Sequence, residues 1–329
     1  MQFLQNVSLN SKTTLQMCSN AAWYCEAHSA EDVVEAVMFA REHKLPILVL
    51  GGGSNLVLSS DIEGLVLANC VLGRELSEKR VRLGAGENWH DFVSHATRQG
   101  IGGFENLALI PGNAGAAPMQ NIGAYGLELQ DRFISLEAID LESGERVIFD
   151  RSDCGFGYRE SLFKQERRWC ITAIDLEPSE EIRASYPGVR SWLESHELEA
   201  THESIFSAVC EIRTDKLPDV VSHPNAGSFF KNPVVPLTVS EALQKSYPDL
   251  PSFPDAAGVK LSAAWLIDQA GLKGAAEGGF SVSEQHALVI THDGSSRFSE
   301  LHRLVDRIRT RVLERFGVAL EVEPTIYPG

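Results

Sequence analysis

The chain of 329 residues has little basic charge and no long hydrophobic run. It carries 29 Lys and Arg residues against 45 Asp and Glu residues, which gives a net charge of -16. Nucleic acids and anionic membranes recruit clustered Lys and Arg, so neither is expected as a partner. The N-terminal region holds no apolar segment of signal-peptide length, and no run reaches a membrane span. These absences predict a cytoplasmic protein.

The cysteines and histidines do not form the patterns of a metal site. None of the 6 cysteines belongs to a Cys-x-x-Cys pair, and the histidines are scattered. A structural zinc site needs such ligands at close spacing, so we predict no metal and expect free thiols. No internal repeat or low-complexity segment is present.

The glycine run at 51–55, Gly-Gly-Gly-Ser-Asn, lies between two strand-like segments at 46–50 and 56–58. A Rossmann fingerprint opens a helix and a Walker loop ends in Gly-Lys-Ser/Thr, so the run is neither. Consecutive backbone amides in a glycine-rich turn can still bind a pyrophosphate. An ordinary tight turn is the alternative interpretation.

A second run, at 110–126, is rich in glycine, alanine and proline and has neither a helical nor a strand period of apolar residues. Small residues let backbone N–H groups approach a flat or phosphorylated ligand. A solvated linker would carry more Ser, Lys or Glu. The run therefore predicts a cofactor-binding loop, with a long surface loop as the alternative.

The rest of the first two thirds alternates strands with separate helices. Ser29 and Asp32 predict a capped helix that ends near residue 43, and Trp89 and Phe92 lie on the inner face of another at 88–99. The predicted strands are at 46–50, 56–58, 65–67, 80–83, 133–140, 146–149 and 169–176. This mixture predicts α+β lobes rather than a doubly wound sheet.

The pattern of predicted helices and strands changes after residues 216–218. Helices are predicted at 239–246, 262–269 and 299–316, with strands near 287–290 and 318–323. A chain of this length exceeds the usual size of one core, so we expect a domain boundary near 216–224.

Three polar clusters do not fit any amphipathic pattern. In Gly-Tyr-Arg-Glu-Ser at 157–161, Arg159 offers a planar fork suited to a carboxylate, although a surface arginine is the alternative. In 225–233, Ser228 precedes two phenylalanines that we expect to line a pocket. No nucleophile elbow surrounds Ser228, which disfavours hydrolysis. Glu321 and Glu323 near the chain end look like solvated acids from the pattern alone.

Together these clusters resemble the UDP-N-acetylenolpyruvoylglucosamine reductase family. The resemblance lies in segments 50–58, 84–90, 105–112, 118–126, 157–159, 225–233 and 264–269. It extends from about residue 30 to the C-terminus, and the runs 105–126 and 225–233 are highly specific in combination.

The resemblance implies an α+β FAD enzyme with the two-lobed fold of the vanillyl-alcohol-oxidase (PCMH) type and a C-terminal substrate-binding domain. The expected domains are 1–65 for the first FAD-binding lobe, 66–215 for the second and 216–329 for the substrate domain. NADPH would reduce non-covalently bound FAD. The reduced FAD would then reduce the enolpyruvyl ether of UDP-N-acetylglucosamine-enolpyruvate to UDP-N-acetylmuramate for peptidoglycan. A monomer is expected.

The resemblance also assigns roles to residues. Arg159 would stabilise the substrate carboxylate as it becomes enolate-like, Ser228 would donate a proton to the adjacent carbon, and Glu323 would assist from the other side. The positions that would bind FAD are Gly51, Gly52, Gly53, Ser54, Asn55, Ile110, Pro111, Gly112, Ala116, Ala117, Met119, Gln120, Ile122 and Gly123.

The substrate would be bound by Tyr125, Tyr158, Tyr186, Lys216, Asn232, Lys273 and His286. Tyr186 resembles the tyrosine that covers the substrate in the longer subclass of the family. Four cations, Lys216, Lys231, Lys273 and Arg213, are candidates to bind the pyrophosphate and carboxylate in an otherwise acidic protein.

Two other functions stay open at this point. A flavin-dependent sugar or alcohol oxidase on the same fold would explain the glycine loops but not residues 225–233. A flavin-binding protein without catalysis would make Arg159, Ser228 and Glu323 incidental.

Overall fold

A computed structural model describes residues 1–328 of the chain, which form two compact units. Unit 1 consists of Met1–Val7, Asn20–Gly53 and Asp61–Asp215. Unit 2 consists of Ser8–Ser19, Ser54–Ser60 and the described residues from Lys216 onward. Among the described residues, no helix is long and apolar enough to cross a membrane.

The first sheet of unit 1 has the strand order β1-β2-β5-β3. Its strands are β1 (Leu4–Ser8), β2 (Asn20–Ala27), β3 (Ile47–Leu50) and β5 (Ile62–Asn69), and β2 and β3 both pair with β5 in parallel. The predicted lobe boundary at 65/66 falls inside β5, and the residue bounds of the two lobes stay a prediction.

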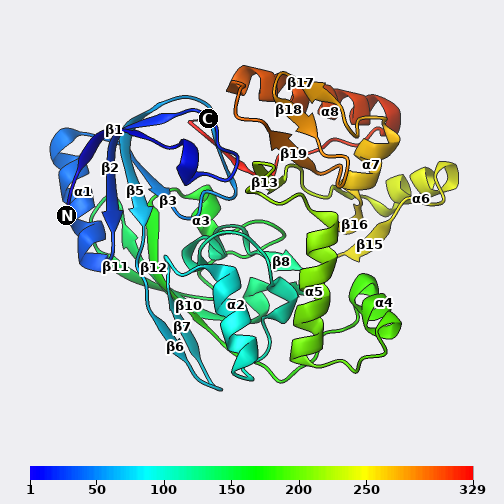
Figure 1. Cartoon of the computed structure of the whole chain (residues 1–329), viewed down its shortest axis with the longest axis horizontal. Coiled ribbons are helices and arrows are strands. Elements are labelled where there is room, and N and C mark those ends of the chain that lie inside the picture. The colour runs from blue at the N-terminus through cyan, green and yellow to red at the C-terminus, as the bar shows by residue number, and fades with distance from the viewer. Residues whose placement is uncertain (329) are drawn as a thin grey trace. The chain divides into compact units, whose positions relative to one another are not determined.

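Helix α1 (Ala30–His43) connects β2 to β3 and lies beside β2 and β5 (Figure 1). Its start follows the predicted cap, because the Ser29 hydroxyl accepts the Asp32 N–H at 3.1 Å. The Asp32 carboxylate accepts the His28 N–H at 2.8 Å. The inner face of the helix packs against the sheet through Val33, Ala36, Val37 and Ala40, all buried.

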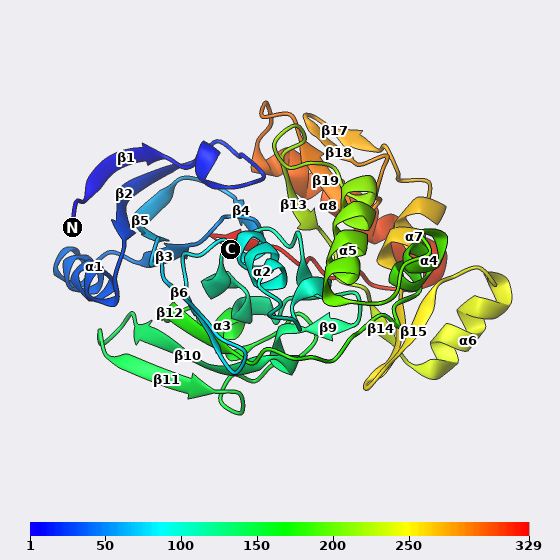
Figure 2. The same ribbon diagram turned by 60° about the horizontal axis from the view of Figure 1, so that its bottom comes forward.

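The second sheet of unit 1 is antiparallel and has the order β11-β10-β12-β7-β6. Its strands are β6 (Arg74–Leu76), β7 (Val81–Gly84), β10 (Phe133–Asp140), β11 (Arg146–Asp150) and β12 (Trp169–Leu176). The hairpin of β10 and β11 runs along the lower edge of Figure 2. The predicted strands at 133–140 and 169–176 are confirmed to the residue.

Four helices complete unit 1: α2 (Trp89–Arg98), α3 (Leu162–Gln165), α4 (Pro187–Ser195) and α5 (His202–Lys216). Asn88 caps α2 by accepting the Asp91 N–H at 3.0 Å, which confirms the predicted helix at 88–99. Helices α4 and α5 were not predicted. The spacing of Ile205, Ala208, Val209 and Ile212, all buried, was the available signal for α5.

Unit 2 holds a four-stranded sheet of order β13-β19-β18-β17 and a three-stranded sheet of order β14-β16-β15. The first contains β13 (Asn225–Ser228), β17 (Ala276–Glu277), β18 (Phe280–Val282) and β19 (Val289–His292). The second contains β14 (Val234–Val235), β15 (Ser252–Asp255) and β16 (Gly258–Leu261). Helices α6 (Leu237–Ser246), α7 (Ala263–Gln269) and α8 (Phe298–Phe316) confirm the three predicted ones, and α8 runs along β17 and β18 (Figure 1).

The predicted strand at 318–323 is wrong. Only Val322 pairs there, in an isolated bridge with Phe230, and the last strand is β20 (Thr325–Tyr327). This strand pairs in parallel with β4 (Leu56–Leu58), the segment directly after the glycine run. A partner so distant in sequence leaves no local pattern, which is why alternation misplaced the strand.

The Ser29 cap gives a prediction for stability. Ser29→Ala removes the acceptor of the Asp32 N–H and should lower the free energy of unfolding by about 1 kcal/mol. Ser29→Asp keeps an acceptor and should stay near the parent value. Urea unfolding followed by circular dichroism measures both variants. Equal loss in the two variants would contradict a capping role.

Candidate active site

The loop at 110–126 is more regular than its sequence suggests. It contains two 3-10 turns, Ala114–Ala116 and Pro118–Gln120, and ends in β8 (Gly123–Ala124), which pairs with β9 (Leu127–Glu128). The prediction that it is neither an α-helix nor a long strand is confirmed.

Three backbone hydrogen bonds attach this loop to the segment before α2. The Trp89 N–H donates to the Gly112 carbonyl at 3.0 Å, and the N–H groups of Ala114 and Gly115 donate to Glu87 at 2.8 Å and Ala85 at 2.9 Å. A methyl group at Gly115 would lie 2.4 Å from Cβ of Ala85. Glycine is therefore required for this close packing, which fixes the position of the loop.

The two glycine runs meet within unit 1. A Cβ atom at Gly52 would lie 2.8 Å from Cα of Gly112, which is closer than real Cβ contacts allow. At Gly51 the same atom would lie 3.7 Å from Cβ of Ala116, an ordinary contact. Backbones that approach one another this closely present their amides on one surface, which suits a pyrophosphate. The residues present thus fit a dinucleotide cofactor.

The predicted FAD-binding residues differ in what they can offer a ligand. Ala117 and Ile122 are buried in the core of unit 1, so only their backbones are available. The N–H groups of Ala116 and Ala117 donate to Asn113 and Ala114 within the turn. Partial exposure is found at Gly51, Gly52, Ile110, Gly112, Met119, Gln120 and Gly123, and Pro111 is exposed. Gly53 is buried. It is the last residue of a segment of unit 1, and Ser54 and Asn55 belong to the segment of unit 2 that follows.

Arg159 is held against the same loop. Its Nη2 atom donates to the Gly123 carbonyl at 2.5 Å, and its Cζ atom lies 5.3 Å from the centre of the Tyr158 ring. Its backbone is left-handed, with φ of 54°, a conformation that costs a non-glycine residue about 1–3 kcal/mol. The Lys164 ammonium donates to its carbonyl at 3.2 Å. Gly123 and Tyr158 thus hold the guanidinium, and Lys164 holds the backbone of Arg159.

Sequence reasoning missed Asn121, which connects this arginine turn to the loop. Asn121 is fully buried, and its Nδ2 donates to the Gly157 carbonyl at 3.1 Å and to Glu128 at 2.9 Å. Its Oδ1 accepts the Gln130 N–H at 2.9 Å. A single amide in a run of small residues was the available signal, since an amide there can satisfy several backbone groups.

Tyr125 and Tyr186, both predicted to bind the substrate, lie together. Their rings meet edge to face with centres 5.1 Å apart, although 61 positions separate them. Tyr125 also has a left-handed backbone, with φ of 48°, and Asn106 donates to its carbonyl at 2.9 Å. Tyr186 is 37% exposed and directly precedes α4.

In unit 2, Ser228 and Glu323 are brought together through the backbone of Phe229. The Phe229 N–H donates to Leu288 at 2.7 Å, and its carbonyl accepts the Glu323 N–H at 3.0 Å. Ser228 itself pairs with Val289 of β19. Two residues that are distant in sequence therefore sit on adjoining stretches of backbone.

The expectation that Phe229 and Phe230 line a pocket is wrong. Their side chains are 0% and 1% exposed and belong to the core of unit 2. Burial of two aromatic rings anchors the chain directly after Ser228, so their role is to fix that residue in place.

The remaining predicted substrate residues differ in their internal hydrogen bonds and in their exposure. The Asn232 side chain accepts the Ala263 N–H at 2.9 Å, next to the start of α7. His286 accepts the Leu288 N–H through Nδ1 at 3.3 Å, so its Nε2 carries the proton when the ring is neutral. Lys216 and Lys273 are exposed. Tyr158, in unit 1, is partly buried.

Two family models match separate parts of the chain. Residues 21–150 match the model of an FAD binding domain, and residues 219–327 match the C-terminal domain of UDP-N-acetylenolpyruvoylglucosamine reductase. The chain resembles a solved reductase from Thermus caldophilus, with a TM-score of 0.69, 25% identity and coverage of 99% of this chain and 98% of the other. The fold of 6-hydroxy-D-nicotine oxidase from Arthrobacter nicotinovorans is also similar, with a TM-score of 0.54, 13% identity and coverage of 97% and 86%. These matches confirm the predicted fold class.

The fold and the matches define an FAD-containing oxidoreductase with a two-lobed flavin-binding domain. Reductases from Pseudomonas fluorescens and Pseudomonas aeruginosa are each 44% identical to the chain, over 98% and 99% of both sequences respectively. The chain therefore belongs to the UDP-N-acetylenolpyruvoylglucosamine reductase family. Its cofactor is FAD.

The contact between the glycine runs gives a prediction for cofactor binding. Gly52→Ala places a methyl group against the Gly112 backbone and should reduce the flavin-to-protein ratio of purified protein severalfold. Gly51→Ala meets only an ordinary contact and should retain more flavin. The ratio is measured by absorbance after acid release of the flavin. Full flavin content in the Gly52 variant would place the pyrophosphate away from this contact.

Proposed function

We propose that the chain uses NADPH to reduce the enolpyruvyl ether of UDP-N-acetylglucosamine-enolpyruvate to UDP-N-acetylmuramate in the cytoplasm. The observation that carries the proposal is the family match at 219–327, which includes both Ser228 and Glu323. A flavin-dependent oxidase or a flavin-binding protein without catalysis does not account for that match. A cytoplasmic location and a monomeric state stay predictions.

The glycine runs of the chain hold FAD without a covalent bond in this proposal. Gly52, Gly112 and Gly123 supply close backbone approach, and the neighbouring amides bind the pyrophosphate. The chemistry that bound FAD would supply is hydride transfer, so that two electrons and a proton taken from NADPH would reach the terminal vinyl carbon of the substrate.

Arg159 binds the substrate carboxylate. As negative charge develops next to that carboxylate, the guanidinium stabilises it more strongly than in the ground state. The hydrogen bond to Gly123 and the contact with the Tyr158 ring orient Arg159 before the substrate arrives, so little reorganisation is required.

Ser228 donates its proton to the carbon adjacent to the carboxylate. A hydroxyl is a weak acid, but a carbanion-like carbon is very basic, so position limits the step more than acidity does. The buried Phe229 and its two backbone hydrogen bonds provide that fixed position. Glu323 assists from the adjoining stretch of backbone, either by orienting the substrate or by a hydrogen bond to the enol form.

The remaining residues bind the rest of the sugar nucleotide. In this proposal Tyr186 covers the substrate, and the other contacts come from Tyr125, Tyr158, Lys216, Asn232, Lys273 and His286. Lys231 is less available than the sequence suggested, because its ammonium pairs with Glu321 at 2.5 Å.

The role of Ser228 can be tested by separating the two half-reactions. Ser228→Ala should leave flavin reduction by NADPH nearly unchanged, because no substrate carbon takes part in that step. Reoxidation by the enolpyruvyl sugar nucleotide should slow by about a hundred- to ten-thousandfold, the usual contribution of a general acid. Stopped-flow absorbance of the flavin measures both rates.

Two controls sharpen this experiment. Ser228→Cys keeps a proton donor in nearly the same place and should recover part of the rate. Ser222→Ala removes an exposed hydroxyl from the loop before β13 and should behave as the parent. If Ser228→Ala reoxidises at the parent rate, Ser228 is only a pocket residue and another group supplies the proton.

A further inference from the structure

Strand β13 contains an extra residue directly before Ser228. Asn225 pairs with Thr291 of β19, and Ser228 pairs with Val289. Between these two pairs β13 has two residues, whereas β19 has one. Such a β-bulge turns the side chains that follow it to the opposite face of the sheet. The bulge therefore sets the face of the sheet on which Ser228 lies.

The side-chain amide of Asn225 holds this bulge. Asn225 is 3% exposed, and its Oδ1 atom accepts the Gly227 N–H at 2.9 Å. Gly227 has a left-handed backbone with φ of 71°, which glycine adopts without strain. The Nδ2 atom of Asn225 donates to the carbonyls of His223 at 2.8 Å and Pro218 at 3.4 Å. Both ends of the amide are thus used to fix the chain around the bulge.

Thr14, from a distant part of the chain, holds the backbone of Asn225. The Asn225 N–H donates to the Thr14 carbonyl at 3.0 Å, and the Thr14 hydroxyl donates to the Asn225 carbonyl at 2.6 Å. The two residues are 211 positions apart, but the segment Ser8–Ser19 belongs to unit 2. These two hydrogen bonds fix the residue at which β13 and its bulge begin.

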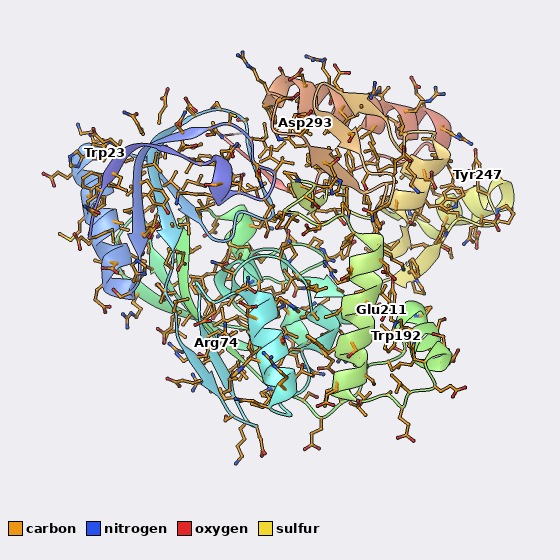
Figure 3. The ribbon with its side chains drawn as sticks, in the orientation of Figure 1. Trp23, Arg74, Trp192, Glu211, Tyr247 and Asp293 are labelled. Carbon is orange, nitrogen blue, oxygen red and sulfur yellow. The ribbon has the colours of Figure 1, made fainter. Side chains whose placement is uncertain are left out.

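The segment that carries Thr14 is itself anchored in unit 2. Leu15 is fully buried in the core of that unit, and its carbonyl accepts a hydrogen bond from Nδ1 of His292 at 3.0 Å. The other ring nitrogen of His292 accepts the Ser296 N–H at 3.2 Å. His292 is the last residue of β19, and Figure 3 labels Asp293, which follows that strand directly. Thr14 therefore acts on Asn225 from a fixed position.

We propose that Thr14 and Asn225 are positioning residues for Ser228, because together they fix the bulge from which its hydroxyl reaches the substrate carbon. The proposal rests on the proposed function, in which Ser228 donates the proton. The backbone hydrogen bonds of Phe229 fix Ser228 from the other side. Proton transfer requires the donor within hydrogen-bond reach of the acceptor, so a small shift of the bulge slows this step and leaves binding of the sugar nucleotide unchanged.

The half-reactions of flavin-loaded Thr14→Val test this role. Valine keeps the shape of threonine but loses the hydrogen bond to the Asn225 carbonyl. Flavin reduction by NADPH should stay at the parent rate, and so should the concentration of the enolpyruvyl sugar nucleotide that gives half-maximal reoxidation. The maximal rate of reoxidation should fall roughly ten- to a hundredfold, as for a misplacement of about 1 Å. Thr14→Ser keeps the hydroxyl and should recover most of the rate.

Two further variants show whether the effect passes through Ser228. The Thr97 hydroxyl donates to the Val93 carbonyl within α2 at 2.9 Å, so Thr97→Val removes a bond of the same kind and should leave both half-reactions unchanged. Adding Thr14→Val to Ser228→Ala should cause no further slowing, because a positioning residue acts only through the group that it positions. Further slowing in this double variant, or parent-like reoxidation in Thr14→Val, would overturn the proposal.

Hydrogen exchange separates this proposal from the proposed function. Exchange of the backbone amides around Gly227, followed by mass spectrometry, should be severalfold faster in Thr14→Val than in the parent, whatever Ser228 does in the reaction. Unchanged exchange there would show that Thr14 does not hold the bulge. Faster exchange together with parent-like reoxidation in Ser228→Ala would refute the proton-donor assignment instead, and Thr14 and Asn225 would then only anchor β13.

Discussion

The close approach of two backbones, at Gly52 and Gly112, is the constraint on which the cofactor site depends. A single methyl group at Gly52 would lie 2.8 Å from Cα of Gly112. Gly112 is in turn fixed to the start of α2, and the loop continues through two 3-10 turns to Gly123, whose carbonyl holds Arg159. The loop at 110–126 therefore connects the proposed flavin-binding surface to Arg159, which a hydrogen bond attaches to its Gly123 end.

The backbone is strained in this loop and beside it, in places that local sequence does not explain. Leu109, Asn121, Tyr125 and Arg159 all have left-handed backbones. Side-chain amides compensate for this: Asn121 holds the turn that carries Arg159, and Asn106 holds the Tyr125 carbonyl. In unit 2, two buried rings and two backbone hydrogen bonds fix Ser228. In the proposed mechanism both arrangements fix the reacting groups before a ligand binds, which is how preorganisation lowers a barrier.

The sequence predicted those parts of the fold that local patterns determine. Ser29 and Asp32 gave the start of α1, and alternation gave β10 and β12. Long-range pairing was beyond such patterns: β20 pairs with β4 across most of the chain, and Phe229 and Phe230 are core residues of unit 2 rather than a pocket lining. Arg159, Ser228 and Glu323 were identified by resemblance to a family, whereas the hydrogen bonds between Thr14 and Asn225 become visible only in three dimensions.

Anaerobic mixing of the purified protein with NADPH and then with the enolpyruvyl sugar nucleotide tests the central claim most directly. The account predicts that NADPH bleaches the flavin absorbance and that the colour returns only when the enolpyruvyl compound is added. UDP-N-acetylglucosamine, which lacks the enolpyruvyl double bond, should leave the flavin bleached. Recovery of the colour without the enolpyruvyl compound, or a flavin that NADPH does not bleach, would contradict the account.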